Sequence, residues 1–175
     1  LYLAKADHGL LTPRREPLEL AREVDALLEF YAPLAEDSLI ALSRTGNGQI
    51  AGDRSMLRRA LSNLLDNALR YTPEGGEIRI ETLIKDTEAS IRVCDNGPGI
   101  PEAERERIFE RFYRAEGTKT IPGTGLGLAI VRRVAELHGG KPSISEGIGG
   151  KGVCFSIDFP ICKAAVEDQP PEADE

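Results

Sequence analysis

The chain has no tryptophan, one methionine and two histidines among its 175 residues. Its three cysteines, Cys94, Cys154 and Cys162, are far apart and form no C-x-x-C pair, which argues against a cysteine-based metal site and favours a reducing, cytosolic compartment. No apolar run approaches the roughly 18 residues that a membrane-spanning helix needs, and the first residues do not read as a signal peptide. The composition predicts a soluble chain.

Charge is spread unevenly. The formal net charge is −7, and the thirteen residues Lys163 to Glu175 carry −4 of it, as five acids and one lysine. The rest of the chain is only mildly acidic and has no basic stripe of the kind that binds nucleic acid. We therefore expect no nucleic-acid partner, one domain, and a disordered acidic tail over residues 163–175.

Residues 1–13 resemble the last turns of a helix that Gly9 and Pro13 stop. Since the chain opens inside this pattern, with Leu1 rather than a methionine, we interpret it as part of a longer protein. The predicted organisation is a helical remnant and linker over residues 1–13, a domain over residues 14–162, and the tail.

Hydrophobic periodicity predicts helices and strands within that domain. Apolar residues recur every three or four positions from Glu16 to about Glu36, which is typical of an amphipathic helix that Pro33 bends or ends. Further helices are predicted from a cap at Asp53 to Tyr71 and over residues 126–138, with a short one near residues 104–109. Strands are predicted within residues 38–44 and 49–52, on either side of a turn, and within residues 77–85, 88–94, 141–147 and 152–160. This order lacks repeated strand–helix–strand units and favours a mixed α/β (α+β) two-layer sandwich.

The helix that ends at Tyr71 has an unusual polar face. At 100° per residue, Asn63 and Asn67 point the same way, on the face that also holds Asp66 and Arg70 and opposite the leucines. Asparagine is a poor helix former, so two aligned amides call for an explanation. One is Mg²⁺ beside a triphosphate, where a neutral carbonyl oxygen coordinates without adding negative charge. The other is a plain surface with Arg70 paired to Asp66.

Two glycine-rich stretches follow. "DNGPGIP", from Asp95 to Pro101, comes after an apolar strand. Its glycines would let the backbone approach a flat ligand, and Asp95 could accept a hydrogen bond from an exocyclic amine of that ligand. The alternative is an ordinary turn. "GTGLGLAI", from Gly123 to Ile130, opens a helix and so presents free N–H groups to phosphate, or is simply a flexible cap. It fits neither the dinucleotide fingerprint nor the P-loop pattern.

The segment between the two glycine stretches contains Phe109, Phe112 and Tyr113, which we expect in the core. They would anchor a mobile loop from Arg114 to Thr124, which has few apolar residues to hold it down. Arg114 and Lys119 could close over phosphates from this loop.

Together these motifs resemble the catalytic and ATP-binding domain of bacterial two-component sensor histidine kinases, of the Bergerat-type superfamily that includes Hsp90, gyrase B and MutL. "NLLDNALRYTP" is similar to the family's N box, "DNGPGIP" to its first glycine box, "ERFYR" to its F box and "GTGLGLAI" to its second, in the family's order and with typical gaps. The resemblance covers about residues 14 to 160. It implies three helices on a mixed five-stranded sheet, with ATP between the N-box helix and a flexible lid.

Carried over by motif, the resemblance implies ATP and Mg²⁺ as cofactors. The amides of Asn63 and Asn67 would hold the metal, and Asp95 would bind the adenine amine. The full set of implied ATP-binding residues is Asn63, Asn67, Arg70, Tyr71, Asp95, Gly97, Gly99, Ile100, Arg114, Lys119, Gly123, Thr124, Gly125, Leu126, Gly127 and Leu128.

The resemblance also implies transfer of the ATP γ-phosphate to a histidine on a dimerisation hairpin, followed by relay to a response-regulator aspartate. That hairpin is absent, because neither His8 nor His138 lies in the family's acceptor pattern. The implied parent protein is a homodimer in the bacterial inner membrane with this domain in the cytoplasm, while the present chain would be monomeric. The alternative is a conformational ATPase or a nucleotide-dependent regulatory module of the same superfamily. The ATPase reading is weakened because Asn63 stands where such enzymes carry a glutamate base.

Overall fold

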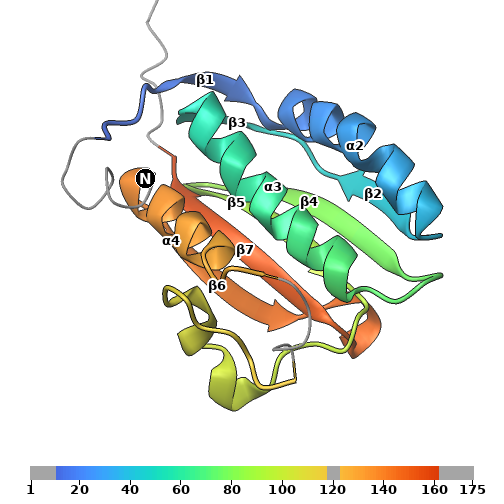
Figure 1. The fold of residues 1–175 in the computed structure, drawn as a ribbon. Coiled ribbons are helices and arrows are strands. Elements are labelled where there is room, and N and C mark those ends of the chain that lie inside the picture. Colours follow the sequence, from blue (N-terminus) through green and yellow to red (C-terminus); the bar gives the residue numbers. More distant parts are fainter. Residues whose placement is uncertain (1–10, 118–122, 162–175) are drawn as a thin grey trace, which may run out of the picture.

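In the computed structural model, which describes residues 11–117 and 123–161, three helices lie against one face of a five-stranded sheet (Figure 1). The predicted two-layer sandwich is confirmed. No helix in these residues combines the length and the apolar character needed to cross a bilayer.

The elements are β1 (Glu16–Glu19), α2 (Leu20–Asp37), β2 (Ala41–Thr45), β3 (Gln49–Gly52), α3 (Arg54–Tyr71), β4 (Glu77–Lys85), β5 (Glu88–Asp95), the 3₁₀ turns η1 (Glu102–Glu104) and η2 (Arg107–Phe109), α4 (Gly127–Leu137), β6 (Lys141–Glu146), η3 (Ile148–Gly150) and β7 (Val153–Pro160).

The strand order of the large sheet is β2-β4-β5-β7-β6. The β2–β4 pair is parallel and the other pairs are antiparallel, so the sheet is mixed. In β4, β5 and β7 alternate residues face the helices, which explains the period-2 pattern in their sequences.

The first helix begins later than its periodicity predicts. Residues 16–19 are strand β1, which pairs antiparallel with β3 in a separate two-stranded sheet, and this pairing buries Leu18 completely. The helix starts at Leu20 and continues through Pro33 to Asp37, so the prediction that Pro33 could end it is wrong. Strands β2 and β3, expected on either side of one turn, belong to different sheets. Residues 104–109 form two short 3₁₀ turns rather than one helix.

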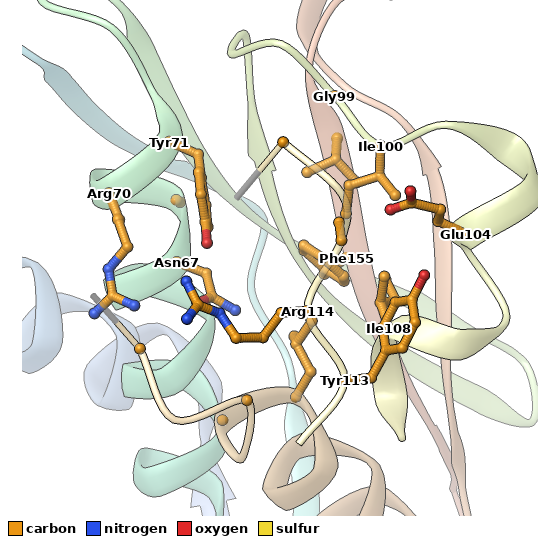
Figure 2. Close-up of a pocket in the computed structure, with 18 of the residues that line it drawn as sticks. Asn67, Arg70, Tyr71, Gly99, Ile100, Glu104, Ile108, Tyr113, Arg114 and Phe155 are labelled. Carbon is orange, nitrogen blue, oxygen red and sulfur yellow. The ribbon is translucent and has the colours of Figure 1, made fainter. Parts of the chain in front are cut away.

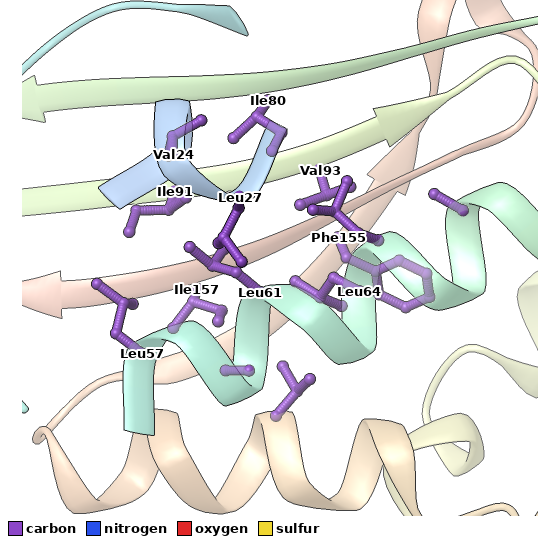
Figure 3. Close-up of a cluster of buried hydrophobic side chains, with 14 of the residues drawn as sticks. Val24, Leu27, Leu57, Leu61, Leu64, Ile80, Ile91, Val93, Phe155 and Ile157 are labelled. Atoms are coloured by element: carbon purple, nitrogen blue, oxygen red, sulfur yellow. The ribbon is translucent and has the colours of Figure 1, made fainter. Parts of the chain in front are cut away.

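The core lies between the helices and the inner face of the sheet. Figure 3 shows Leu57, Leu61 and Leu64 of α3 pointing at side chains from β5 and β7, with Val24 and Leu27 of α2 beside them. Each fully buried leucine contributes about 1.5–3 kcal/mol. Because the leucine face of α3 is held here, its opposite face, with the two asparagines, is directed away from the sheet.

Cys94 and Cys154 are joined by a disulfide. They are directly opposed in the β5–β7 register, although 60 residues separate them in the chain. The sequence-based expectation of a reducing environment gave no indication of this pair, because cross-strand neighbours need not be close in sequence. Cys162 lies outside the described residues.

Candidate nucleotide-binding site

Helix α3 positions the predicted metal end of the site. Its first turn is capped by Asp53, whose Oδ1 accepts from the Met56 N–H at 3.0 Å. Asn63 Nδ2 donates to the Arg59 carbonyl one turn earlier at 2.8 Å, so its Oδ1 is free to point outward. That oxygen lies 3.0 Å from the place where a side chain on Gly127 would begin. The amide oxygen therefore faces the start of α4, and a side chain on Gly127 would crowd it.

The second glycine stretch brings backbone N–H groups to the same end. Helix α4 begins at Gly127, and its N-cap residue, Leu126, makes no side-chain hydrogen bond to the helix. The first backbone N–H groups of α4 therefore remain available to an anion. Gly125 has φ +69° and its carbonyl accepts from the Phe112 N–H at 2.9 Å, which ties the two ends of the predicted lid together. The Arg70 guanidinium approaches Gly123 from α3. Asn63, Arg70 and the free N–H groups of α4 thus converge, an arrangement suited to phosphates with a divalent cation.

Asp95 forms the opposite end, at the last position of β5. It is 3% exposed, and its Oδ1 accepts from the backbone N–H groups of Gly97 (2.9 Å) and Val153 (3.2 Å). Burial raises the pKa of this carboxyl, and the two N–H groups oppose the rise. Because both donors use Oδ1, Oδ2 remains to accept a hydrogen bond from a ligand.

The glycines of the first box have different roles. Gly99 has φ +76° and lines the cavity, and a Cβ there would come within 2.9 Å of the Gly152 carbonyl oxygen. Gly97 does not line the cavity, since a Cβ on it would meet the Tyr71 carbonyl at 2.9 Å. Gly97, predicted as a wall of the base site, is therefore not among the residues that line this cavity, and it lets the loop pack against the end of α3.

One cavity of about 800 Å³ connects these groups, and Figure 2 shows Tyr71, Arg70 and Asn67 on one side of it with Ile100, Glu104 and Tyr113 on the other. Arg114 reaches across it toward α3. Leu126 does not line the cavity, and Lys119 lies outside the described residues. The predicted residues that do line it are Asn63, Asn67, Arg70, Tyr71, Asp95, Gly99, Ile100, Arg114, Gly123, Thr124, Gly125, Gly127 and Leu128.

Sequence reasoning missed part of the lining. Tyr113, expected in the core, packs against it partly buried and also lines the cavity, with the Arg107 guanidinium 4.5 Å from its ring centroid. Phe112 is 72% exposed with φ +60°. Of the three aromatics only Phe109 is buried. Glu104 was also missed; its Oε1 accepts from the Glu116 N–H at 3.3 Å, which joins η1 to the lid. Other missed residues are Asp66, Ala68, Pro98, Pro101, Ile108, Ala115, Glu116, Gly117, Val153 and Phe155.

The donor set of the site suits a hard cation that a ligand also coordinates. Among the described residues no group of three or more His, Cys, Asp and Glu side chains could hold a metal ion. The amide oxygen of Asn63 is nevertheless directed at the phosphate end, and such neutral oxygen ligands fit Mg²⁺ that arrives with a nucleotide.

Comparison with known proteins agrees with this geometry. The model of the histidine kinase-, DNA gyrase B- and HSP90-like ATPase family matches residues 52–163. The chain belongs to this family. Over 160 residues it is 37% identical to the probable sensor protein PcoS of Escherichia coli, covering 90% of this chain and 34% of that protein.

Solved structures of family members share the fold. The mycobacterial sensor histidine kinase MprB superposes with a TM-score of 0.75 at 36% identity, covering 83% of this chain and 97% of that one. Full-length ShkA in complex with AMPPNP superposes with a TM-score of 0.81 at 27% sequence identity. The match covers 93% of this chain and 34% of the ShkA chain. The predicted identity as a histidine kinase ATP-binding catalytic domain is confirmed. The chain spans about a third of the length of the curated relatives it matches.

Proposed function

We propose that this family member binds Mg·ATP and donates the γ-phosphate to a histidine on a helical hairpin elsewhere in its parent protein. The proposal rests chiefly on one relationship: the Asn63 amide oxygen faces the uncapped N-terminus of α4, at the opposite end of the cavity from Asp95. The cavity would therefore have a metal-and-phosphate end at Asn63 and a base end at Asp95. ShkA, which has the same fold, was solved with the ATP analogue AMPPNP.

The base end selects adenine by hydrogen bonding. The free Oδ2 of Asp95 would accept from the exocyclic amine, which guanine lacks at that position. Tyr71 and Ile100 lie on opposite walls of the cavity and would enclose the base between an aromatic and an aliphatic surface (Figure 2).

The phosphate end supplies positioning and charge stabilisation. Asn63 and Asn67 would hold Mg²⁺, which neutralises phosphate charge when bound. Arg70, Arg114 and the N–H groups at the start of α4 would fix the phosphate oxygens. These groups act by orientation and electrostatics, so the nucleophile can come from the acceptor histidine, which forms the new P–N bond as the bond to ADP breaks.

His138 does not fit the acceptor role, because it is 4% exposed and both of its ring nitrogens are engaged. His8 lies outside the described residues, and its surrounding sequence does not resemble the family's acceptor pattern. We propose that residues 1–13 link to the hairpin, that residues 14–162 are the catalytic unit, and that residues 163–175 are a tail outside it. The parent would be a dimeric membrane sensor whose response regulator receives the phosphoryl group on an aspartate.

A phosphotransfer assay tests the proposal. With γ-labelled Mg·ATP the chain alone should bind nucleotide but acquire no acid-labile phosphate, whereas the hairpin of the same parent protein, fused or added at high concentration, should become labelled. The matched control replaces Asn67 with alanine, which should abolish labelling of the hairpin. Label on the isolated chain that disappears in His8→Ala or His138→Ala would contradict the proposal, as would a hairpin that is never labelled.

A further inference from the structure

A hydrogen bond from a neighbouring helix reaches the rim of the cavity. The Tyr31 hydroxyl on α2 donates to Asp66 Oδ1 at 2.8 Å and also lies 3.4 Å from the Ser62 carbonyl oxygen. Tyr31 is 6% exposed, whereas Asp66 is exposed and lines the cavity. Within the described residues Asp66 has no other hydrogen-bond or ion-pair partner, so the sequence-based alternative of an Asp66–Arg70 pair is not what the structure has.

The tyrosine remains a donor throughout the physiological pH range. Burial, followed by the hydrogen bond to Asp66, raises the pKa of Tyr31 to about 12. A buried hydroxyl needs a partner, and the Ser62 carbonyl alone could serve. Instead the shorter bond goes to a carboxylate, which fixes an otherwise mobile acidic side chain at the cavity wall.

Asp66 stands between the two predicted metal ligands in sequence. It follows Asn63 by three residues and directly precedes Asn67, so three oxygen-bearing side chains occupy adjacent turns on the cavity side of α3. Mg²⁺ in nucleotide sites keeps several water ligands, and those waters need hydrogen-bond acceptors. An anchored carboxylate beside neutral amide ligands is such an acceptor.

We propose that Tyr31 is a positioning residue for the metal end of the site. By engaging Oδ1 it holds the Asp66 carboxylate at the rim, where Oδ2 accepts from the water shell of Mg²⁺ and does not displace an amide ligand. The inference rests on the Mg·ATP function proposed above. It makes α2, none of whose residues line the cavity described above, part of the metal site through Asp66.

The test compares Tyr31→Phe, Asp66→Asn and the double variant by titration calorimetry, with Mg·ATP and with ADP in EDTA. Each single substitution should raise the Kd for Mg·ATP by about tenfold. The Kd for metal-free ADP should change by no more than about twofold. The double variant should bind like Asp66→Asn, because Tyr31 acts only through Asp66. Equal losses for both ligands, additive losses, or no loss would overturn the proposal.

Arg58→Met is the matched structural control. Arg58 Nε donates to Glu23 at 2.7 Å and so also joins α2 to α3, but neither residue lines the cavity. This variant should melt at a lower temperature and keep the wild-type ratio of Mg·ATP affinity to ADP affinity. A changed ratio would show that any loosening of the contact between α2 and α3 affects metal binding, and it would overturn the proposal.

If the wild type binds no Mg·ATP, the proposed function fails and this inference with it. If Asn67→Ala loses metal-dependent binding while Tyr31→Phe does not, only this inference fails.

Discussion

The imidazole of His138 joins the end of α4 to the beginning of α3. Its Nε2 accepts from the Asp53 N–H at 2.9 Å, and its Nδ1 donates to the Val134 carbonyl at 2.8 Å. This pattern requires a neutral ring with the proton on Nδ1, because a protonated Nε2 would face another donor. Asp53 caps α3, so the contact helps fix the helix that carries Asn63 and Asn67.

The neutral ring makes stability depend on pH. Burial lowers the pKa of His138 below its usual 6.5, and the hydrogen bond to the Val134 carbonyl opposes this shift; the Arg15 charge lowers the pKa further, and the Asp53 charge raises it. The stabilisation should therefore be complete above pH 6.5 and fall as the pH drops through the folded pKa, since the unfolded chain then binds the proton more readily. Melting temperatures from pH 8 to 5 measure this. His138→Gln offers an acceptor that does not titrate, so its melting temperature should change less with pH. If its melting temperature fell as steeply with pH as that of the wild type, the loss of stability would come from other groups.

Asn67→Asp tests the metal end. A carboxylate beside the triphosphate adds repulsion, so Mg·ATP should bind at least about tenfold more weakly, while ADP in EDTA loses less. Asn47→Asp is the control for net charge, because Asn47 lies in the turn before β3 and a carboxylate can still accept from the Gly48 N–H. Calorimetry that finds the same loss for both nucleotides would exclude a metal role for Asn67.

Asp95→Asn tests the base end. The remaining carbonyl can keep the bonds from Gly97 and Val153, but an NH₂ group replaces the free acceptor and would meet the adenine amine donor to donor. ATP affinity should fall by about tenfold or more, and GTP affinity should change little. The exposed Asp86→Asn serves as the control. Unchanged ATP binding by Asp95→Asn would remove Asp95 from the site.

Gly125→Ala tests the anchoring of the lid. Its Cβ would lie 2.8 Å from Phe112 backbone atoms and 3.0 Å from the Tyr113 carbonyl oxygen, which forces the two ends of the lid apart. Gly75→Ala also places alanine at positive φ, at a similar cost of about 1 kcal/mol, but meets nothing within 4 Å and lies outside the cavity lining. We expect Gly125→Ala to weaken ATP binding by about tenfold and Gly75→Ala to bind nearly as the wild type does. Similar affinities for the two variants would show that the contact with Phe112 is unimportant.

Local sequence was sufficient wherever one element determines its own faces. The Asp53 cap, the leucine stripe of α3 and the alternation in β4 and β5 predicted those elements, because side-chain direction follows backbone period. The same reasoning placed Asn63 and Asn67 on one face and, with the glycine stretches, indicated a nucleotide site. The order and spacing of four motifs identified the family, since no single motif was specific.

Tertiary structure decided what those faces meet. Residues 16–19 have helical periodicity but form a strand, because pairing with β3 buries Leu18 and satisfies backbone groups that a helix N-terminus would leave open. The bond from Tyr31 to Asp66, the Cys94–Cys154 pair and the contact of Gly97 with Tyr71 each join residues far apart in the chain. Periodicity specifies which side of an element is apolar, but the partner across a contact depends on how distant elements pack, and that is settled only when they pack together.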